Sequence, residues 1–149
     1  MGYIKKHLMS GETIVYQTKL NWSEYLKGIT IIIIGIIIIK SSNTAGTFGG
    51  FLVLVGLFLL GKSFLKMKSS EFAVTDKRVL IKVGILRTQS LETMLNKVEG
   101  IHVEQGLVDK MFGCGNIDVK GTGGTKNSFA GIDNPFEFRN AVNEQISKQ

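Results

Sequence analysis

Residues that could perform acid–base or nucleophilic chemistry are few and scattered in this sequence of 149 residues. His7 lies near the N-terminus, and His102 alternates with Ile101 and Val103, which predicts an outward-facing strand residue. Cys114 is the single cysteine, so neither an internal disulfide nor a cysteine metal site can form. No H-E-x-x-H, D-x-D or phosphate-loop pattern is present. The sequence therefore predicts no enzyme, and no catalytic, cofactor or metal site.

The segment Gly121-Thr-Gly-Gly-Thr125 has a composition that could bind an anion, because glycine amides can cradle a phosphate. It lacks the lysine and the spacing of a Walker loop, and no helix follows it. A turn or bulge between two strands is the favoured interpretation.

Basic residues offer a second kind of chemistry, the binding of anionic lipid headgroups. Near an anionic bilayer each such residue contributes about 1 kcal/mol. The alternative is a solvated polar face. The residues predicted to face lipid are Lys62, Lys66, Lys68, Lys77, Arg78, Lys82 and Arg87.

Two apolar segments would place these residues at a membrane. The first is Leu26–Ile39 and the second, without charge, covers residues 41–61. A helix needs about 20 residues to cross a bilayer, and Trp22 and Tyr25 extend the first segment as an interfacial belt. Two buried strands are the alternative, but strands are normally shorter. The apolar stretch also begins too late for a cleaved signal peptide.

A short linker from Lys40 to Thr47 predicts that the two helices, at about residues 22–40 and 44–64, form a hairpin within residues 22–66. Lysines concentrate before and after the hairpin, so the positive-inside rule predicts a multi-pass protein of the cell membrane with both termini in the cytoplasm. Glycines recur at spacings that allow close helix packing, although such spacings arise readily in a chain with 18 glycines. These glycines are Gly28 and Gly35, Gly49 and Gly56, and the GxxxG pair Gly46 and Gly50.

The remainder reads as a β domain with a final helix. Short alternating runs separated by turn residues predict seven strands, at residues 13–20, 70–75, 78–83, 85–91, 98–105, 116–120 and 126–132. In the first run, Ile14, Tyr16 and Leu20 are expected on one face. A helix is predicted over residues 134–147, with Asn134 as its cap and Glu137 completing a capping box.

Several stretches together resemble the bacterial pleckstrin-homology (PH)-like domain family of small membrane proteins with two transmembrane helices. They are Ser70–Val79, Lys97–Ile101, Gly113–Ile117, Gly121–Thr125 and Asn134–Phe138. The resemblance implies a seven-stranded barrel-like sandwich closed by a C-terminal helix, with its first strand separated from the others by the membrane hairpin. Asp109-Lys110 stands where a Gly-Arg pair is expected, and Thr88 replaces a second basic residue after Arg87.

The expected organisation is an N-terminal segment with the first strand (residues 1–21), the hairpin (22–66) and the remaining β domain (67–149). The net charge is +6; six basic and two acidic residues lie up to Lys62, and twelve basic and ten acidic residues follow. This mild, membrane-centred excess does not indicate nucleic acid. Two functions remain open. One is a non-catalytic binding or assembly module that docks a protein partner or a second copy of itself, and the other is an anionic-lipid sensor.

Overall fold

A computed structural model describes residues 3–41, 46–84 and 88–149, and it divides into two compact units. The β unit comprises Met1–Asn21 and Ser69–Gln149, and the helical unit comprises Trp22–Lys68. The helical unit is therefore inserted between the first two strands of the β unit, and each unit is described by itself below.

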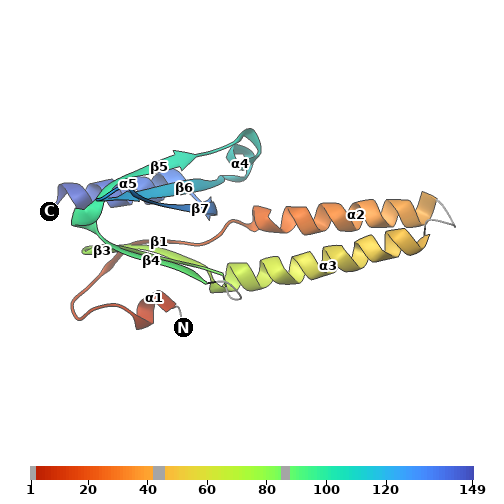
Figure 1. Cartoon of the computed structure of the whole chain (residues 1–149), viewed down its shortest axis with the longest axis horizontal. Helices are drawn as coiled ribbons and strands as arrows, with labels where there is room; N and C mark the ends of the chain where they lie inside the picture. The colour runs from red at the N-terminus through yellow and green to blue at the C-terminus, as the bar shows by residue number, and fades with distance from the viewer. Residues whose placement is uncertain (1–2, 42–45, 85–87) are drawn as a thin grey trace. The chain divides into compact units, whose positions relative to one another are not determined.

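The described part of the β unit contains seven strands in two antiparallel sheets (Figure 1), which confirms the predicted number. The first sheet has the order β1 (Ile14–Thr18), β2 (Glu71–Thr75), β3 (Arg78–Val83) and β4 (Gln89–Met94). The second has the order β5 (Val98–Glu104), β6 (Cys114–Gly121) and β7 (Thr125–Asp133). A short 3-10 turn, η2 (Leu95–Lys97), joins the sheets, and α4 (Leu107–Phe112) joins β5 to β6.

The strand predicted at 85–91 lies further along the chain. β4 begins at Gln89 and continues to Met94, which pairs with Arg78 at the start of β3. Residues 85–87 lie outside the described residues. The glycine-rich segment is a turn between β6 and β7, as expected, with Gly123 and Gly124 at positive φ.

The main core lies between the sheets and the C-terminal helix α5 (Pro135–Ser147). Phe72 of β2 makes edge-to-face contacts with Phe129 of β7 and Phe138 of α5, with ring centroids 6.2 and 6.4 Å apart. Val142, one helical turn beyond Phe138, is fully buried. The apolar side of the last helix, with Phe138 and Val142, therefore closes the sandwich.

A smaller cluster covers the outer face of the first sheet. Ile4 of the short helix α1 (Tyr3–Lys6) packs on Ala73 and Leu80, with Leu8 and Ile14 at its edge. The prediction that Ile14 shares a face with Tyr16 was wrong, because a β-bulge between them shifts the register against β2. Tyr16 instead contacts Phe138 on the inner face.

The predicted capping box at the start of α5 was also wrong. Asn134 has a left-handed backbone (φ 48°) and its side chain makes no cap hydrogen bond. The carboxylate of Glu137 accepts a hydrogen bond from the Tyr16 hydroxyl at 3.2 Å instead of reaching back to the helix start. Burial, reinforced by Glu137, raises the pKa of Tyr16 to about 12. Glu137 therefore ties α5 to β1.

The helical unit consists of a 3-10 turn, η1 (Trp22–Tyr25), and the helices α2 (Leu26–Ser41) and α3 (Gly46–Ser69). Both Trp22–Ser41 and Gly46–Ser69 are long and apolar enough to cross a membrane. The helices α2 and α3 pack against each other through the glycines that are spaced seven residues apart. A Cβ added at Gly35 would lie 2.9 Å from the carbonyl of Gly49, and one added at Gly49 would lie 2.8 Å from the carbonyl of Gly35.

The same contact repeats one heptad away, where an added Cβ at Gly56 would lie 3.1 Å from the carbonyl of Gly28. Gly46 and Gly50, in contrast, have open space where a Cβ would be. The seven-residue glycine pairs thus allow α2 and α3 to approach closely, whereas the GxxxG pair lies away from this interface.

Candidate membrane-facing surface

The outward surface of the helical unit is made of large apolar side chains. Within each candidate span only 11% of the residues are buried, which is far less than in a core helix of a soluble protein. Leu54 and Phe58 of α3 are 67% and 73% exposed, and Ile37 of α2 is 59% exposed. An apolar surface of this extent is unstable in water and favourable in hydrocarbon.

Charged side chains gather where α2 begins and α3 ends. Lys66 forms an ion pair with Glu24 at 3.2 Å, and the Ser63 hydroxyl donates a hydrogen bond to the Glu24 carbonyl oxygen. Lys62 and Lys68 are exposed on the last turns of α3. Of the three lysines predicted to face lipid here, Lys66 therefore also fastens η1 to α3.

The chain leaves and re-enters the β unit at one end of the first sheet. Thr18, at the end of β1, pairs with Phe72 near the start of β2. At this end the Gly84 N–H donates to the Ser70 hydroxyl at 3.2 Å, and half-buried Lys82 pairs in register with Glu71. Lys82 is thus close to the segment that follows Lys68. Arg87 lies outside the described residues.

Lys77 and Arg78 lie at the opposite end of β2. A five-residue strand spans about 17 Å, so Lys77, although exposed, is far from Ser70, the residue before β2. Lys77 and Arg78 thus lie at one end of the β2–β3 hairpin and Lys82 at the other, so these three described basic residues of the β unit do not form one cluster.

Arg78 is 6% exposed and fully engaged inside the β unit. Its Nε and Nη2 atoms each donate to the Glu12 carboxylate at 2.9 Å, and Nη1 donates to Glu92 at 3.0 Å. Nη2 also donates to the His7 carbonyl oxygen at 2.6 Å. This burial does not fit the predicted lipid-facing role, because a headgroup would have to displace Glu12.

Glu12 and Arg78 each shift the pKa of the other. Hydrogen bonding from Arg78 lowers the pKa of Glu12 to about 2, against the opposing effect of burial and with help from the Met9 N–H and the Thr75 hydroxyl. The same bond raises the pKa of Arg78. Both groups are therefore charged across the physiological range, and the pair holds the N-terminal segment on the sheet.

A pH dependence of stability follows. A carboxyl whose pKa is lower in the folded than in the unfolded state stabilises the fold above the unfolded value, and this contribution is lost as the pH falls. As the pH falls from 4.5 to 2, protonation of Glu12 should therefore lower the unfolding free energy of the β unit by about 3 kcal/mol. Denaturant unfolding of the full chain in detergent, followed by circular dichroism at several pH values, measures this. Glu12→Gln should flatten the profile, and an unchanged slope would contradict the assignment.

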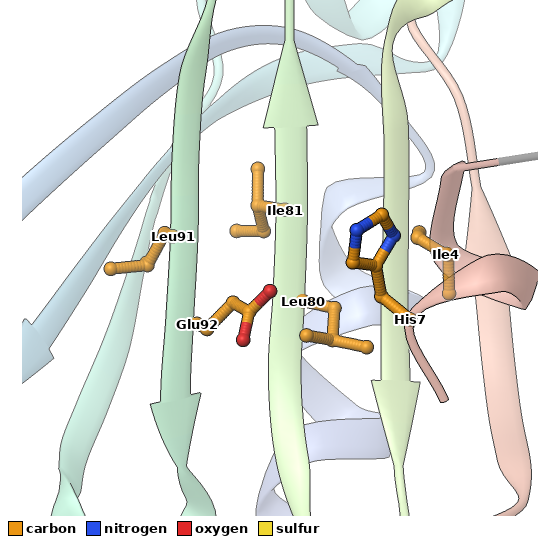
Figure 2. A pocket seen from close by; sticks show the side chains of 6 residues that line it. All are labelled: Ile4, His7, Leu80, Ile81, Leu91 and Glu92. Carbon is orange, nitrogen blue, oxygen red and sulfur yellow. The ribbon is translucent and has the colours of Figure 1, made fainter. Parts of the chain in front are cut away.

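A shallow depression lies beside this pair on the outer face of the first sheet (Figure 2). It is partly open to solvent and has no enclosed space large enough for a water molecule. Its lining comes from β3, β4 and the N-terminal segment, namely Ile4, His7, Leu80, Ile81, Leu91 and Glu92. Glu92 is bonded to Arg78, so the depression offers little polar chemistry to a ligand.

The other residues considered for chemistry are separate from one another. His102 is exposed on β5, as predicted, with its Nε2 atom 3.6 Å from Glu104. Cys114 is buried, and its Sγ lies 3.7 Å from the Asp109 carboxylate. Residues 3–41, 46–84 and 88–149 contain no group of three His, Cys, Asp or Glu side chains placed to hold a metal.

One contact was not anticipated from the sequence. The side-chain amide of Asn21 donates to the Phe112 carbonyl oxygen at 3.1 Å and to the Asp133 carboxylate at 2.6 Å. Asn21 is the last residue of the β unit before Trp22. The only sequence signal was the apolar content of Leu107-Val-Asp-Lys-Met-Phe112, which is too short to show a helical period.

Comparison with known proteins gives one family. Residues 23–146 match the family model described as bacterial PH domain, and this range includes all of the helical unit except Trp22 and every strand except β1. A comparison with curated proteins gave no significant match.

Proposed function

This chain belongs to the bacterial PH domain family, and on that premise we propose that it is a membrane-anchored, non-catalytic binding module on the cytoplasmic face of the cell membrane. PH-like domains generally bind rather than catalyse, and a fold alone does not specify the ligand. The observation that carries the proposal is the glycine-packed pair of apolar helices. This helix pair is inserted in the chain between β1 and β2, which are paired. Two covalent connections therefore attach the helices to the β unit, both at one end of its first sheet.

The lysine distribution supports the orientation. Exposed Lys62 and Lys68 follow the hairpin, and Lys5, Lys6 and Lys19 precede it, whereas Lys40 is the only lysine near the connection between the helices. Basic residues flanking membrane spans favour the cytoplasmic side. Both termini and the β unit are therefore proposed to be cytoplasmic, in a protein that crosses the membrane twice.

The docking surface we propose is the outer edge of β4. Among the described residues this strand pairs only with β3, and most of its own residues are exposed. Edge strands are usually protected by charges, but the one charged residue of β4, Glu92, is bonded to Arg78. β5, one of the two edge strands of the other sheet, carries Glu99 and Glu104. β4 is therefore a better template than β5 for an extended segment of a protein partner or of a second copy.

Photo-crosslinking in native membranes tests this docking surface. The full chain carries a photoreactive amino acid at Ser90, on β4, or at Thr122, in the exposed turn between β6 and β7, as the matched control. Ser90 should give a discrete protein adduct that Thr122 does not, and its mass separates a second copy from another protein. Equal adducts at both positions would overturn the proposal.

Anionic-lipid sensing is a second candidate, favoured by the position of Lys82 beside the segment that follows α3. With Lys62 and Lys68 it would bring three lysines toward headgroups, each contributing about 1 kcal/mol. Lys77 and Arg87 remain predictions in this role, and Arg78 is left out because of its burial. A photoreactive residue at position 82 that captures lipid, together with no protein adduct at 90, would favour the lipid function.

A further inference from the structure

The short helix α4 exposes three apolar side chains side by side. Leu107 is 88% exposed, Val108 62% and Met111 84%, and Leu107 and Met111 are the most exposed large hydrophobic residues described in the chain. Residues i and i+4 lie on one side of a helix, so Leu107 and Met111 are neighbours. A soluble surface would normally carry polar residues at such positions.

The local structure holds α4 firmly in this arrangement. The Asp109 carboxylate accepts a hydrogen bond from the Gly106 N–H at 3.2 Å at the start of the helix. Gly113 ends it in the left-handed conformation (φ 68°), which favours glycine. Gln105 donates to the Cys114 carbonyl oxygen at 2.6 Å. The acidic residue of α4 is thus turned toward its own helix, and the outward side carries apolar groups and exposed Lys110.

The position of α4 is fixed by Asn21. The Asn21 amide bonds the carbonyl of Phe112, the last residue of α4, and Asn21 is covalently joined to Trp22, where the first candidate membrane span begins. The end of α4 therefore lies within a few ångströms of the residue after which the chain enters the proposed membrane segment.

We propose that α4 inserts Leu107, Val108 and Met111 into the lipid surface next to the point where the hairpin enters the bilayer. This rests on the proposed membrane anchoring. Apolar faces of interfacial helices lie about 5–10 Å into the boundary between headgroups and acyl chains. Lys110 stays at headgroup level, where anionic lipids attract it. α4 is then a third attachment of the β unit to the membrane, beside its two covalent connections.

The chemistry of the patch favours lipid over a protein partner. A stable protein interface buries about 800 Å² per partner and needs a polar rim with matched hydrogen bonds. Three neighbouring side chains on a helix of six residues supply too little area for this. They are sufficient for a lipid surface, where affinity comes from apolar burial and from a nearby cation without any matching shape.

Depth-dependent fluorescence quenching of the full chain in vesicles tests the inference. In a Cys114→Ala background, one environment-sensitive dye is attached at Met111→Cys, at Lys77→Cys or at Ile37→Cys. The vesicles contain an anionic phospholipid and a lipid with a nitroxide on its acyl chain, and iodide serves as the aqueous quencher. Position 37, on the outward side of α2, reports membrane insertion itself, and position 77, at the far end of β2, reports the aqueous surface.

The expected result is a blue-shifted emission at position 111, with nitroxide quenching several-fold stronger than at position 77 and weak iodide quenching. If position 37 is quenched by the nitroxide but position 111 behaves like position 77, the insertion of α4 into lipid is refuted and membrane anchoring stands. If position 37 is not quenched either, the proposed anchoring fails as well. Protection of position 111 from both quenchers would show a protein contact and would also overturn the inference.

Discussion

Arg78→Met is expected to lower the unfolding free energy of the β unit by about 3–5 kcal/mol, because it leaves the buried carboxylate of Glu12 without its counter-charge. The Glu12 side chain has no solvent exposure, and two of the three nitrogens of Arg78 bond to it. Methionine retains much of the packing volume, so the loss reports on charge rather than on a cavity. Thermal and denaturant unfolding of the full chain in detergent, followed by circular dichroism, measures the effect.

Two further variants make this prediction specific. Lys77→Met removes a basic residue from the same turn, but Lys77 is exposed, so this change should have little effect. Adding Glu12→Gln to Arg78→Met should recover part of the stability, because the unpaired charge disappears. If Arg78→Met and Lys77→Met were equally mild, Arg78 would be an accessible surface residue and its lipid-facing role would be open again.

Gly49→Ile is expected to separate α2 from α3, whereas Gly50→Ile is expected to leave them packed. A Cβ at Gly49 would lie 2.8 Å from the carbonyl oxygen of Gly35 and 3.0 Å from the backbone nitrogen of Ile39, and neither can move without shifting α2. Gly50 has nothing within 4 Å. Overpacking of this kind typically costs about 1–3 kcal/mol. The two adjacent substitutions differ only in the face of α3 that they occupy.

Pulsed electron spin resonance distances between labels at Ile36 and Leu54 measure the packing in vesicles. Both positions face away from the helix contact, with exposures of 44% and 67%, so the labels do not disturb it. Wild type and Gly50→Ile should give the same narrow distribution, and Gly49→Ile a longer and broader one. Identical distributions for all three proteins would show that the glycine contacts do not hold the hairpin together.

Local patterns were sufficient to predict most of the longer elements of this protein, whereas the short helices α1 and α4 were not predicted. Alternation predicted most strands, and the long uncharged runs predicted α2 and α3. The seven-residue spacing identified Gly28, Gly35, Gly49 and Gly56, because a fixed spacing on a helix places residues on one face. These features depend on neighbours a few residues apart, which a single sequence displays directly.

Features that depend on distant residues could not be predicted in the same way. Arg78 looked like a surface cation because its partner, Glu12, is 66 residues away. Glu137 looked like a capping residue because its partner, Tyr16, is 121 residues away. The bulge that moves Ile14 to the outer face depends on the pairing of β1 with β2. The exposed apolar residues of α4 could not be interpreted from the sequence, because the hydrogen bond between Asn21 and the Phe112 carbonyl oxygen joins residues 91 positions apart.

Thiol labelling of intact cells gives the most direct test of the central claim, that the apolar hairpin crosses the membrane and holds the β unit in the cytoplasm. Single cysteines replace Ser41, at the end of α2, and Lys77, in the β unit, in the Cys114→Ala background. A membrane-impermeant maleimide should label Ser41→Cys in intact cells and Lys77→Cys only after lysis. Labelling of Ser41→Cys only after lysis would contradict the claim.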